Sequence, residues 1–168
     1  MRVNECNGKG ESMLNVGKVF KLKLNGDAPE NQPLEMVRAA YGWSEGWEYC
    51  GTPVKGIQTG EFKLVEVDRC EDLDEVIRRI SAPGITPSGQ WLNAIAQGFS
   101  FWKIKRLSPI GIPDPSWIPP HGTPHFPFIS TNGAQKFTWA NHIDASLPWL
   151  WLMQVRKSSE AGDKTGIL

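Results

Sequence analysis

Five side chains suited to acid–base or metal chemistry fall within one stretch of about thirty residues in the C-terminal half of the chain. They are His121, His125, His142, Asp114 and Asp144. Two histidines four residues apart can share a metal ion when both lie on one face of a helix. Here the surrounding sequence, PPHGTPH, excludes a helix because of its prolines and glycine. We therefore predict surface histidines, with no metal ion and no cofactor.

Asp114 and Asp144 are the only carboxylates between Glu75 and Glu160. An enzyme built on this chain would be a small hydrolase that uses both aspartates and one of the three histidines. That hypothesis requires the groups to converge, because acid–base partners must reach one another through hydrogen bonds or one water. The sequence has no GxSxG turn, no cysteine beside a histidine and no glycine-rich phosphate loop. These absences favour a binding domain over an enzyme.

Aromatic and basic residues alternate just after residue 98. Phe101 and Trp102 run into Lys103, Lys105 and Arg106. Aromatic rings can stack on bases while cations hold phosphates, so one hypothesis is a binder of single-stranded nucleic acid. The alternative, which we favour, is a helix end whose aromatics pack inward, followed by a solvated basic loop.

The chain contains eight tryptophans, and Trp117 stands out among them. It lies between prolines in the long irregular segment 108–125, which we expect to be a loop outside the core. Long ordered loops are often functional, and tryptophan is a frequent hot-spot residue. The leading hypothesis is a non-catalytic domain that binds a protein or small ligand through this loop. Its predicted binding residues are Trp117, Trp102, His121, His125, Lys103 and Arg106.

On this hypothesis Trp117→Ala abolishes binding and leaves folding intact. The other interpretation makes Trp117 a ring that covers the sheet. The rest of the aromatic half allows the same two interpretations, since indoles also build small cores.

Composition describes a single domain of ordinary type. The 168 residues have no net charge, with 11 basic and 14 acidic residues in 1–84 and 7 and 4 in 85–168. We expect one globular domain over 16–157, with disordered segments at 1–15 and 158–168.

Three cysteines without CxxC spacing favour reduced thiols. The sequence has no apolar run long enough for a membrane span and no pattern typical of a signal peptide. We therefore predict a cytoplasmic protein. The oligomeric state, and the choice of Met1 or Met13 as the start, stay open.

Hydrophobic periodicity predicts the elements that must position these residues. Alternation predicts strands at 18–24, 47–49 and 61–68, and helical spacing predicts helices at 33–41, 72–80 and 87–98. The third helix is expected to have Thr86 as its N-cap and Pro87 at its first position.

Strands dominate the C-terminal part. Asn132-Gly133 predicts a two-residue hairpin that pairs Phe128 with Phe137 and Phe126 with Trp139. In this register Pro127 occupies a ladder position that requires an amide. Segment 148–156 is apolar on both faces, which predicts a central strand. The predicted fold is α+β: a curved, mainly antiparallel sheet with two to three helices packed on it, in the order β-α-β-β-α-α-β-β-β.

Overall fold

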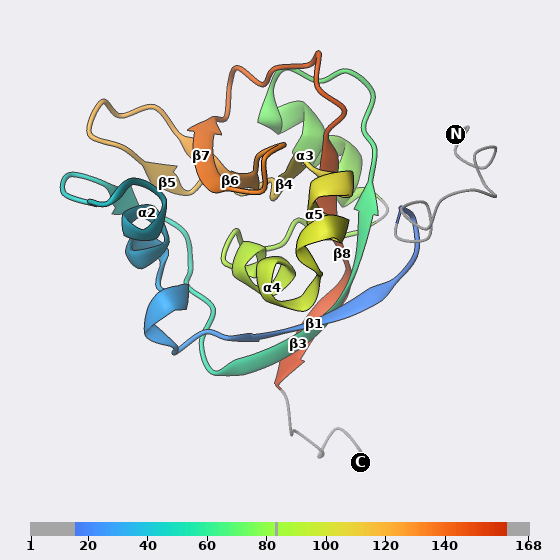
Figure 1. Ribbon diagram of the computed structural model, residues 1–168, viewed down its shortest axis with the longest axis horizontal. Coiled ribbons are helices and arrows are strands. Elements are labelled where there is room, and N and C mark those ends of the chain that lie inside the picture. Colours follow the sequence, from blue (N-terminus) through green and yellow to red (C-terminus); the bar gives the residue numbers. More distant parts are fainter. Residues whose placement is uncertain (1–15, 83, 161–168) are drawn as a thin grey trace.

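The computed structural model describes residues 16–82 and 84–160, which form a curled eight-stranded sheet with helices packed on both of its faces (Figure 1). The strands are β1 (Phe20–Asn25), β2 (Glu48–Tyr49), β3 (Ile57–Val65), β4 (Ile110–Gly111), β5 (Trp117–Ile118), β6 (His125–Ile129), β7 (Gln135–Trp139) and β8 (Leu150–Glu160). The helices are the 3-10 helix η2 (Pro29–Asn31) and the α-helices α2 (Pro33–Tyr41), α3 (Leu73–Ser81), α4 (Trp91–Gly98) and α5 (Phe101–Leu107).

The strand order is β1-β3-β8-β4-β6-β5-β2, and β7 pairs with β6 outside this path. Every pair of strands is antiparallel except β4 with β8. The α+β class and the mainly antiparallel sheet confirm the prediction, although the sheet has more strands than expected. The predicted segment 1–15 lies outside the described residues, as do residues 161–168, whereas residues 158–160 belong to β8.

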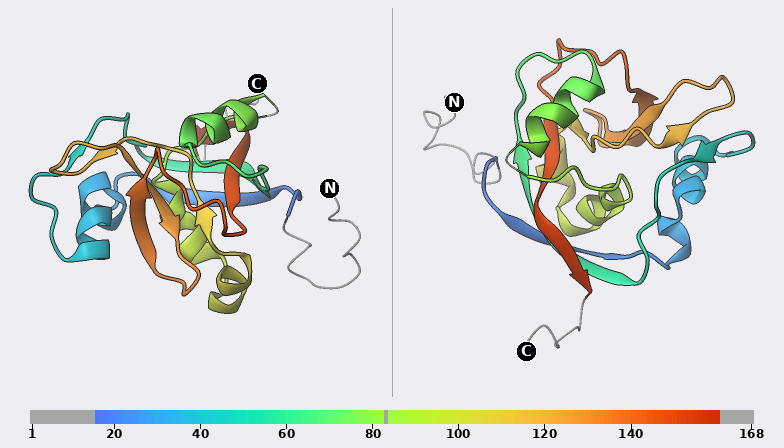
Figure 2. Two further views of the ribbon diagram at one scale, coloured as in Figure 1. Left: turned by 90° about the horizontal axis from the view of Figure 1, so that it is seen from above. Right: turned by 180° about the vertical axis from the view of Figure 1, so that it is seen from behind.

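The sheet separates two groups of buried side chains. Helices α4 and α5 lie in the hollow of the curl, and α3 lies against the opposite face (Figure 2). Strand β8 contributes to both groups: Leu150 and Leu152 pack on the α4 side, and Trp151 and Met153 pack on the α3 side. All four are buried, which confirms the prediction of a central, doubly covered strand.

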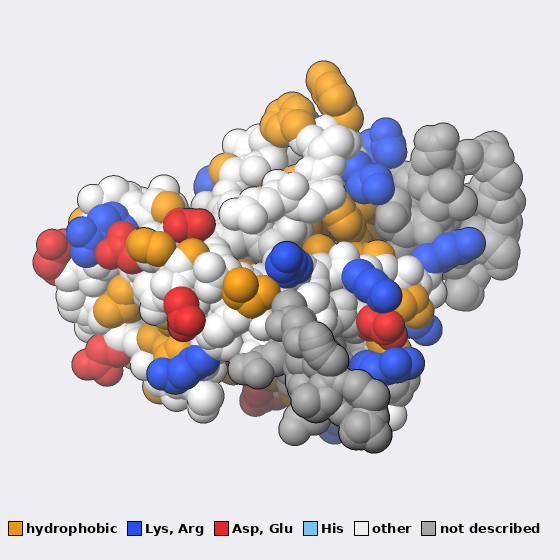
Figure 3. Space-filling model, turned by 90° about the horizontal axis from the view of Figure 1, so that it is seen from below, with side chains coloured by type: hydrophobic (Ala, Val, Ile, Leu, Met, Phe, Trp, Pro, Cys, Tyr) orange, Lys and Arg blue, Asp and Glu red, His pale blue; other side chains and the backbone are white. Residues whose placement is uncertain are grey.

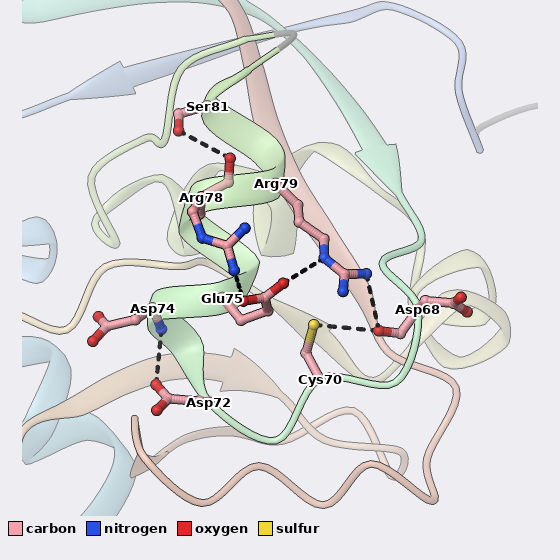
Figure 4. Close-up of polar contacts among 8 residues, drawn as sticks. All are labelled: Asp68, Cys70, Asp72, Asp74, Glu75, Arg78, Arg79 and Ser81. Carbon is pink, nitrogen blue, oxygen red and sulfur yellow. Dashed lines mark hydrogen bonds and ion pairs between the residues drawn. The ribbon is translucent and has the colours of Figure 1, made fainter.

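Helix α3 shows how local sequence fixes one element. The Asp72 carboxylate accepts a hydrogen bond from the backbone N–H of Asp74 at 3.0 Å and caps the first turn (Figure 4). Glu75 pairs with Arg78 and, at 2.7 Å, with Arg79 one turn later. Basic residues in the last turn also favour the helix dipole. This helix therefore forms within one residue of its predicted position.

Two helical predictions need correction. Helix α4 begins at Trp91 rather than at Pro87, because the preceding residues bond elsewhere: Ile85 pairs with Gln154 of β8, and the Gly89 N–H donates to Asp114 at 2.7 Å. The basic segment is not a loop but helix α5. Ser100 caps it by accepting from the Lys103 N–H at 3.1 Å.

The hairpin register differs from the prediction by one residue. The Ser130 N–H donates to Ala134 O at 2.8 Å, which closes a three-residue loop with Gly133 at φ 89°. Phe128 therefore lies opposite Lys136, and Pro127 lies opposite Phe137.

This register resolves the difficulty at Pro127. The flanking residues 126 and 128 take the hydrogen-bonded positions of the antiparallel ladder, so no amide is required at 127. The backbone N–H and C=O of Phe137 then face away from β6 and bond instead to the Tyr41 hydroxyl, each at 2.9 Å.

Trp117 is a core residue, which corrects the expectation that its loop lies outside the core. Its ring has no exposed surface, and its Nε1–H donates to the carbonyl of Pro33 at 2.9 Å. Tyr49 and Phe137 pack on it, with ring centroids 4.7 and 5.3 Å away. Removal of this ring would leave a large buried cavity, so Trp117→Ala probes stability rather than contact with a partner.

The packing around Trp117 predicts the effect of a single added methyl group. A Cβ at Gly89 would lie 2.5 Å from the Trp117 ring and 2.7 Å from Pro127. We expect Gly89→Ala to lower the free energy of unfolding by about 1–3 kcal/mol. Gly98→Ala is the control, because its Cβ would meet only Leu22 at 3.6 Å. Urea denaturation should show that control to be neutral or stabilised by up to about 1 kcal/mol. Equal stability of the two variants would contradict the packing around Trp117.

Candidate functional site

An aromatic hollow of about 630 Å³ opens on the surface between the end of α2 and the β5–β6 connection. We call it the aromatic pocket. Its walls are Tyr41, Trp43, Trp47, Pro119, Pro120, His121 and His125. No carboxylate, lysine or arginine lines it, and the size is within the ordinary range for small-ligand sites.

Two glycines shape the first wall. Gly42 ends α2 with φ 87°, and this left-handed residue turns the chain so that Trp43 follows the helix. Gly46 has φ 84°, and a Cβ there would lie 2.9 Å from Pro120. The close contact of Gly46 with Pro120 joins the two walls of the pocket.

A short strand pair holds the second wall in place. Strand β2 pairs with β5, so that Glu48 lies opposite Ile118 and Tyr49 opposite Trp117. Beyond β5 the Gly122 N–H donates to Pro119 O at 2.8 Å, which forms the turn that carries His121. His125 then starts β6. The imidazoles of His121 and His125 lie 5.5 Å apart, so the predicted histidines do come together.

The pocket rests on a continuous layer of rings. Tyr41 stacks on Trp47 with centroids 6.0 Å apart and planes at 19°. Trp47 also contacts Phe137 at 5.8 Å, and Phe137 contacts Trp117. Trp117 therefore lies behind the pocket and positions its floor without lining it. Of the predicted binding residues in loop 108–125, His121 and His125 line the pocket, whereas Trp117 is buried and is not available to a ligand.

His125 is buried, with 8% of its surface exposed, which corrects the prediction that the histidines lie on the surface. Burial lowers its pKa below the ordinary value of 6.5, against the opposing effect of its bond to Thr123, and neighbouring His121 lowers it further. Its Nδ1 lies 2.8 Å from the carbonyl oxygen of Thr123. A carbonyl only accepts, so Nδ1 carries the hydrogen and Nε2 of the neutral ring is an acceptor.

Trp47 supplies a second polar group. It is 8% exposed, and its buried Nε1–H has no hydrogen-bond acceptor within the part of the chain that the structure describes. A buried donor without a partner costs roughly 1–3 kcal/mol. The pocket therefore combines apolar ring faces with an imidazole acceptor, and an unsatisfied indole donor lies in its wall.

The other predicted binding residues lie on a separate surface. Trp102, Lys103 and Arg106 are on α5, which contributes nothing to the aromatic pocket. Trp102 is 70% exposed, so its ring does not pack inward as the favoured interpretation of that segment expected.

Asp144 and Asp114 have separate partners. Asp144 accepts from the Ser146 hydroxyl at 2.6 Å and from its N–H at 3.0 Å, and these bonds lower the pKa of the carboxyl. It lines a cavity of about 650 Å³ together with His142 and Ser146. The Ser146 hydroxyl therefore bonds to a carboxylate rather than to an imidazole.

Asp114 is enclosed by loops. It accepts from Gly89 N–H and Ser116 Oγ, and burial raises the pKa of its carboxyl despite these bonds. Asp114 does not line the Asp144 cavity. Burial, and to a lesser degree the charge of Asp114, raise the pKa of neighbouring Tyr49 to about 12. The hydrogen bonds that Asp114 accepts tie the segment before α4 to the start of β5.

Within residues 16–82 and 84–160, no three His, Cys, Asp or Glu side chains gather closely enough to hold a metal ion. Over the same residues, no helix has the length and apolar character needed to cross a membrane.

Three residues of the pocket were not anticipated from the sequence. Tyr41, Trp43 and Trp47 fall where a predicted helix ends and a predicted strand begins. The signal was present, because three aromatic residues there are interleaved with Gly42 and Gly46. What the sequence could not indicate is that β2 pairs with β5, which brings these rings to His125.

The state of His125 predicts a pH dependence of stability. Because its folded pKa is lowered, the unfolded chain binds a proton in a range where the folded chain does not. Its contribution to stability is therefore complete above pH 6.5 and is lost as the pH falls below that value. We expect His125→Gln to flatten the decline in unfolding free energy between about pH 7 and about pH 5, measured by urea denaturation. Parallel pH profiles for the two proteins would mean that His125 is solvated.

Comparison with known proteins gives no lead: no protein-family model, no curated protein and no solved structure matches the chain significantly.

Proposed function

We propose that this protein is a binding domain, and that the aromatic pocket is its contact site. The ligand is either an apolar ring that carries one hydrogen-bond donor or a proline-like group, on a small molecule or on a protein partner. The observation that carries the proposal is the uncharged pocket of about 630 Å³, walled by aromatic rings and prolines.

Exposure supports this assignment. Trp43 is 46% exposed and Tyr41 is 38% exposed, although the fold buries other tryptophans completely. Tryptophan and tyrosine contribute much of the energy at binding sites because they bury large areas with few rotatable bonds. Tyr41 ends α2, and its hydroxyl is bonded to the backbone of Phe137, so little ordering of this ring is needed when a ligand binds.

Polarity defines the ligand further. His125 lines the pocket with its Nε2 left to accept a hydrogen bond, and no carboxylate, lysine or arginine in the lining attracts an ion. A ring with an N–H or O–H group therefore matches the pocket better than a phosphate or a carboxylate. Indole and 4-methylphenol are simple probes of this chemistry, and a hexaproline peptide tests for proline recognition.

Trp43→Ala is expected to weaken probe binding by about tenfold or more, since loss of a contact indole typically costs above 1 kcal/mol. Saturation-transfer NMR and intrinsic fluorescence titration would measure the affinity. Trp102→Ala is the matched control, because its indole is exposed and lies outside the pocket. The proposal fails if no probe binds the wild-type protein, or if both variants bind as the wild type does.

A further inference from the structure

Helix α5 carries a second surface that the aromatic pocket does not explain. We call it the α5 face and define it by Phe101, Trp102, Lys103, Lys105 and Arg106. Phe101 is 55% exposed and Trp102 is 70% exposed, the two highest values among the large hydrophobic side chains that the structure describes. Burial in the core accounts for neither ring.

The helix is held firmly beneath these rings. Ile104 and Leu107 are buried, and the Ser100 cap fixes the first turn. In Figure 3, hydrophobic side chains project from the end of the molecule where α5 lies, and cationic side chains stand beside them. The aromatic rings are thus displayed on an anchored helix.

The two rings have defined orientations. Phe101 and Trp102 meet edge to face, with centroids 5.5 Å apart and planes at 70°. Phe101 also lies against the β6–β7 turn, where a Cβ on Gly133 would be 3.3 Å from its ring. The Lys105 ammonium lies 5.6 Å from the centre of the Phe101 ring. Because Trp102 is 70% exposed, much of its ring is available to a flat group.

The charged side chains of α5 itself are all positive, although the protein is neutral overall. Lys105 and Arg106 are exposed on the helix, and Lys136 is exposed on β7 beyond the turn that contacts Phe101. The sequence contains no carboxylate between Glu75 and Asp114. A face with this charge favours an anionic partner.

A polar cavity adjoins the same turn. It has a volume of about 450 Å³, and Gly133, which touches Phe101, is part of its wall. Three amide side chains line it together with the carboxylate of Glu30: Asn93, Gln97 and Gln135. The Asn93 Nδ2 group already donates to the Glu30 carbonyl and to the Asn31 side chain, so Gln97 and Gln135 supply the donors for a ligand. Amides offer both donors and acceptors, which match the edges of nucleobases. Lipid headgroups have no such flat polar edge, so the cavity favours nucleic acid over a membrane surface.

We propose that the α5 face binds single-stranded nucleic acid. Bases stack on Trp102 and Phe101, Lys105 and Arg106 hold phosphates, and the amide cavity receives the edge of a base. Each component of the site matches one component of an unpaired strand. A duplex, with its bases stacked inside, leaves the rings without a partner.

The test is fluorescence anisotropy of labelled oligo(dT), oligo(dA) and oligo(U) of about 15 nucleotides, a length that covers one small domain. The wild-type protein is expected to bind at least one of them. Affinity should fall roughly 10- to 20-fold between about 50 and 200 mM salt if about three phosphates are contacted. The corresponding duplex should bind more weakly.

Trp102→Ala is expected to weaken binding about tenfold or more through the loss of stacking. Lys105→Ala with Arg106→Ala should weaken binding and also reduce its salt dependence. Trp139→Ala is the matched control, since it removes a 46% exposed indole that lies outside α5 and the amide cavity. Unchanged melting temperatures would establish that the variants are folded.

Several outcomes would overturn the proposal. They are no binding of any oligonucleotide, binding that is independent of salt, and equal binding by wild type and Trp102→Ala. Trp102-dependent binding to vesicles of phosphatidylserine and phosphatidylcholine, without binding to oligonucleotides, would identify a membrane surface instead. Because the aromatic pocket is probed with uncharged rings and with Trp43→Ala, failure of either proposal leaves the other intact.

Discussion

The buried indole of Trp117 is the contact on which the rest of this half of the molecule depends. Its N–H bonds to the carbonyl of Pro33 across 84 positions of the chain, and so joins the start of α2 to β5. Its ring supports Tyr49 and Phe137, and Phe137 supports Trp47 in the pocket wall. A polar bond in a water-free site tolerates little displacement, because an unpaired buried donor is costly. The pocket therefore has a rigid floor.

The two proposed surfaces differ in character because their surroundings differ. In the aromatic pocket, burial lowers the pKa of His125 and so favours its neutral form, and the walls present ring faces and prolines without a carboxylate, lysine or arginine. On the α5 face, cations project from a short helix whose other side is fixed in the core. A net charge of zero conceals this division, since the acids are concentrated in the N-terminal half of the chain. The proposed recognition by shape and the proposed recognition by charge therefore involve separate elements.

Local elements could be predicted from the sequence, and long-range contacts could not. The helices at 33–41 and 73–81 were predicted nearly to the residue, because helical periodicity and the placement of Pro33 in the first turn are local signals. The hairpin was also predicted, but its register was wrong, since Asn132-Gly133 fits a two-residue or a three-residue loop. The burial of Trp117 depends on Pro33 and Gly89, which are remote in sequence. The local sequence around Trp117, with its prolines, suggested an exposed loop instead.

The number of tryptophans carried less information than their exposure. Trp91, Trp117 and Trp151 are at most 2% exposed and build the core, whereas Trp43 and Trp102 are 46% and 70% exposed. No composition or spacing separates these groups, because an indole is equally suited to a core and to an interface. An exposed ring on an anchored element leaves apolar area in contact with water. Neither packing in the core nor capping of a helix explains that exposure. That exposure, in Trp43 beside the pocket and in Trp102 beside the cations, is the basis of the two proposed binding surfaces.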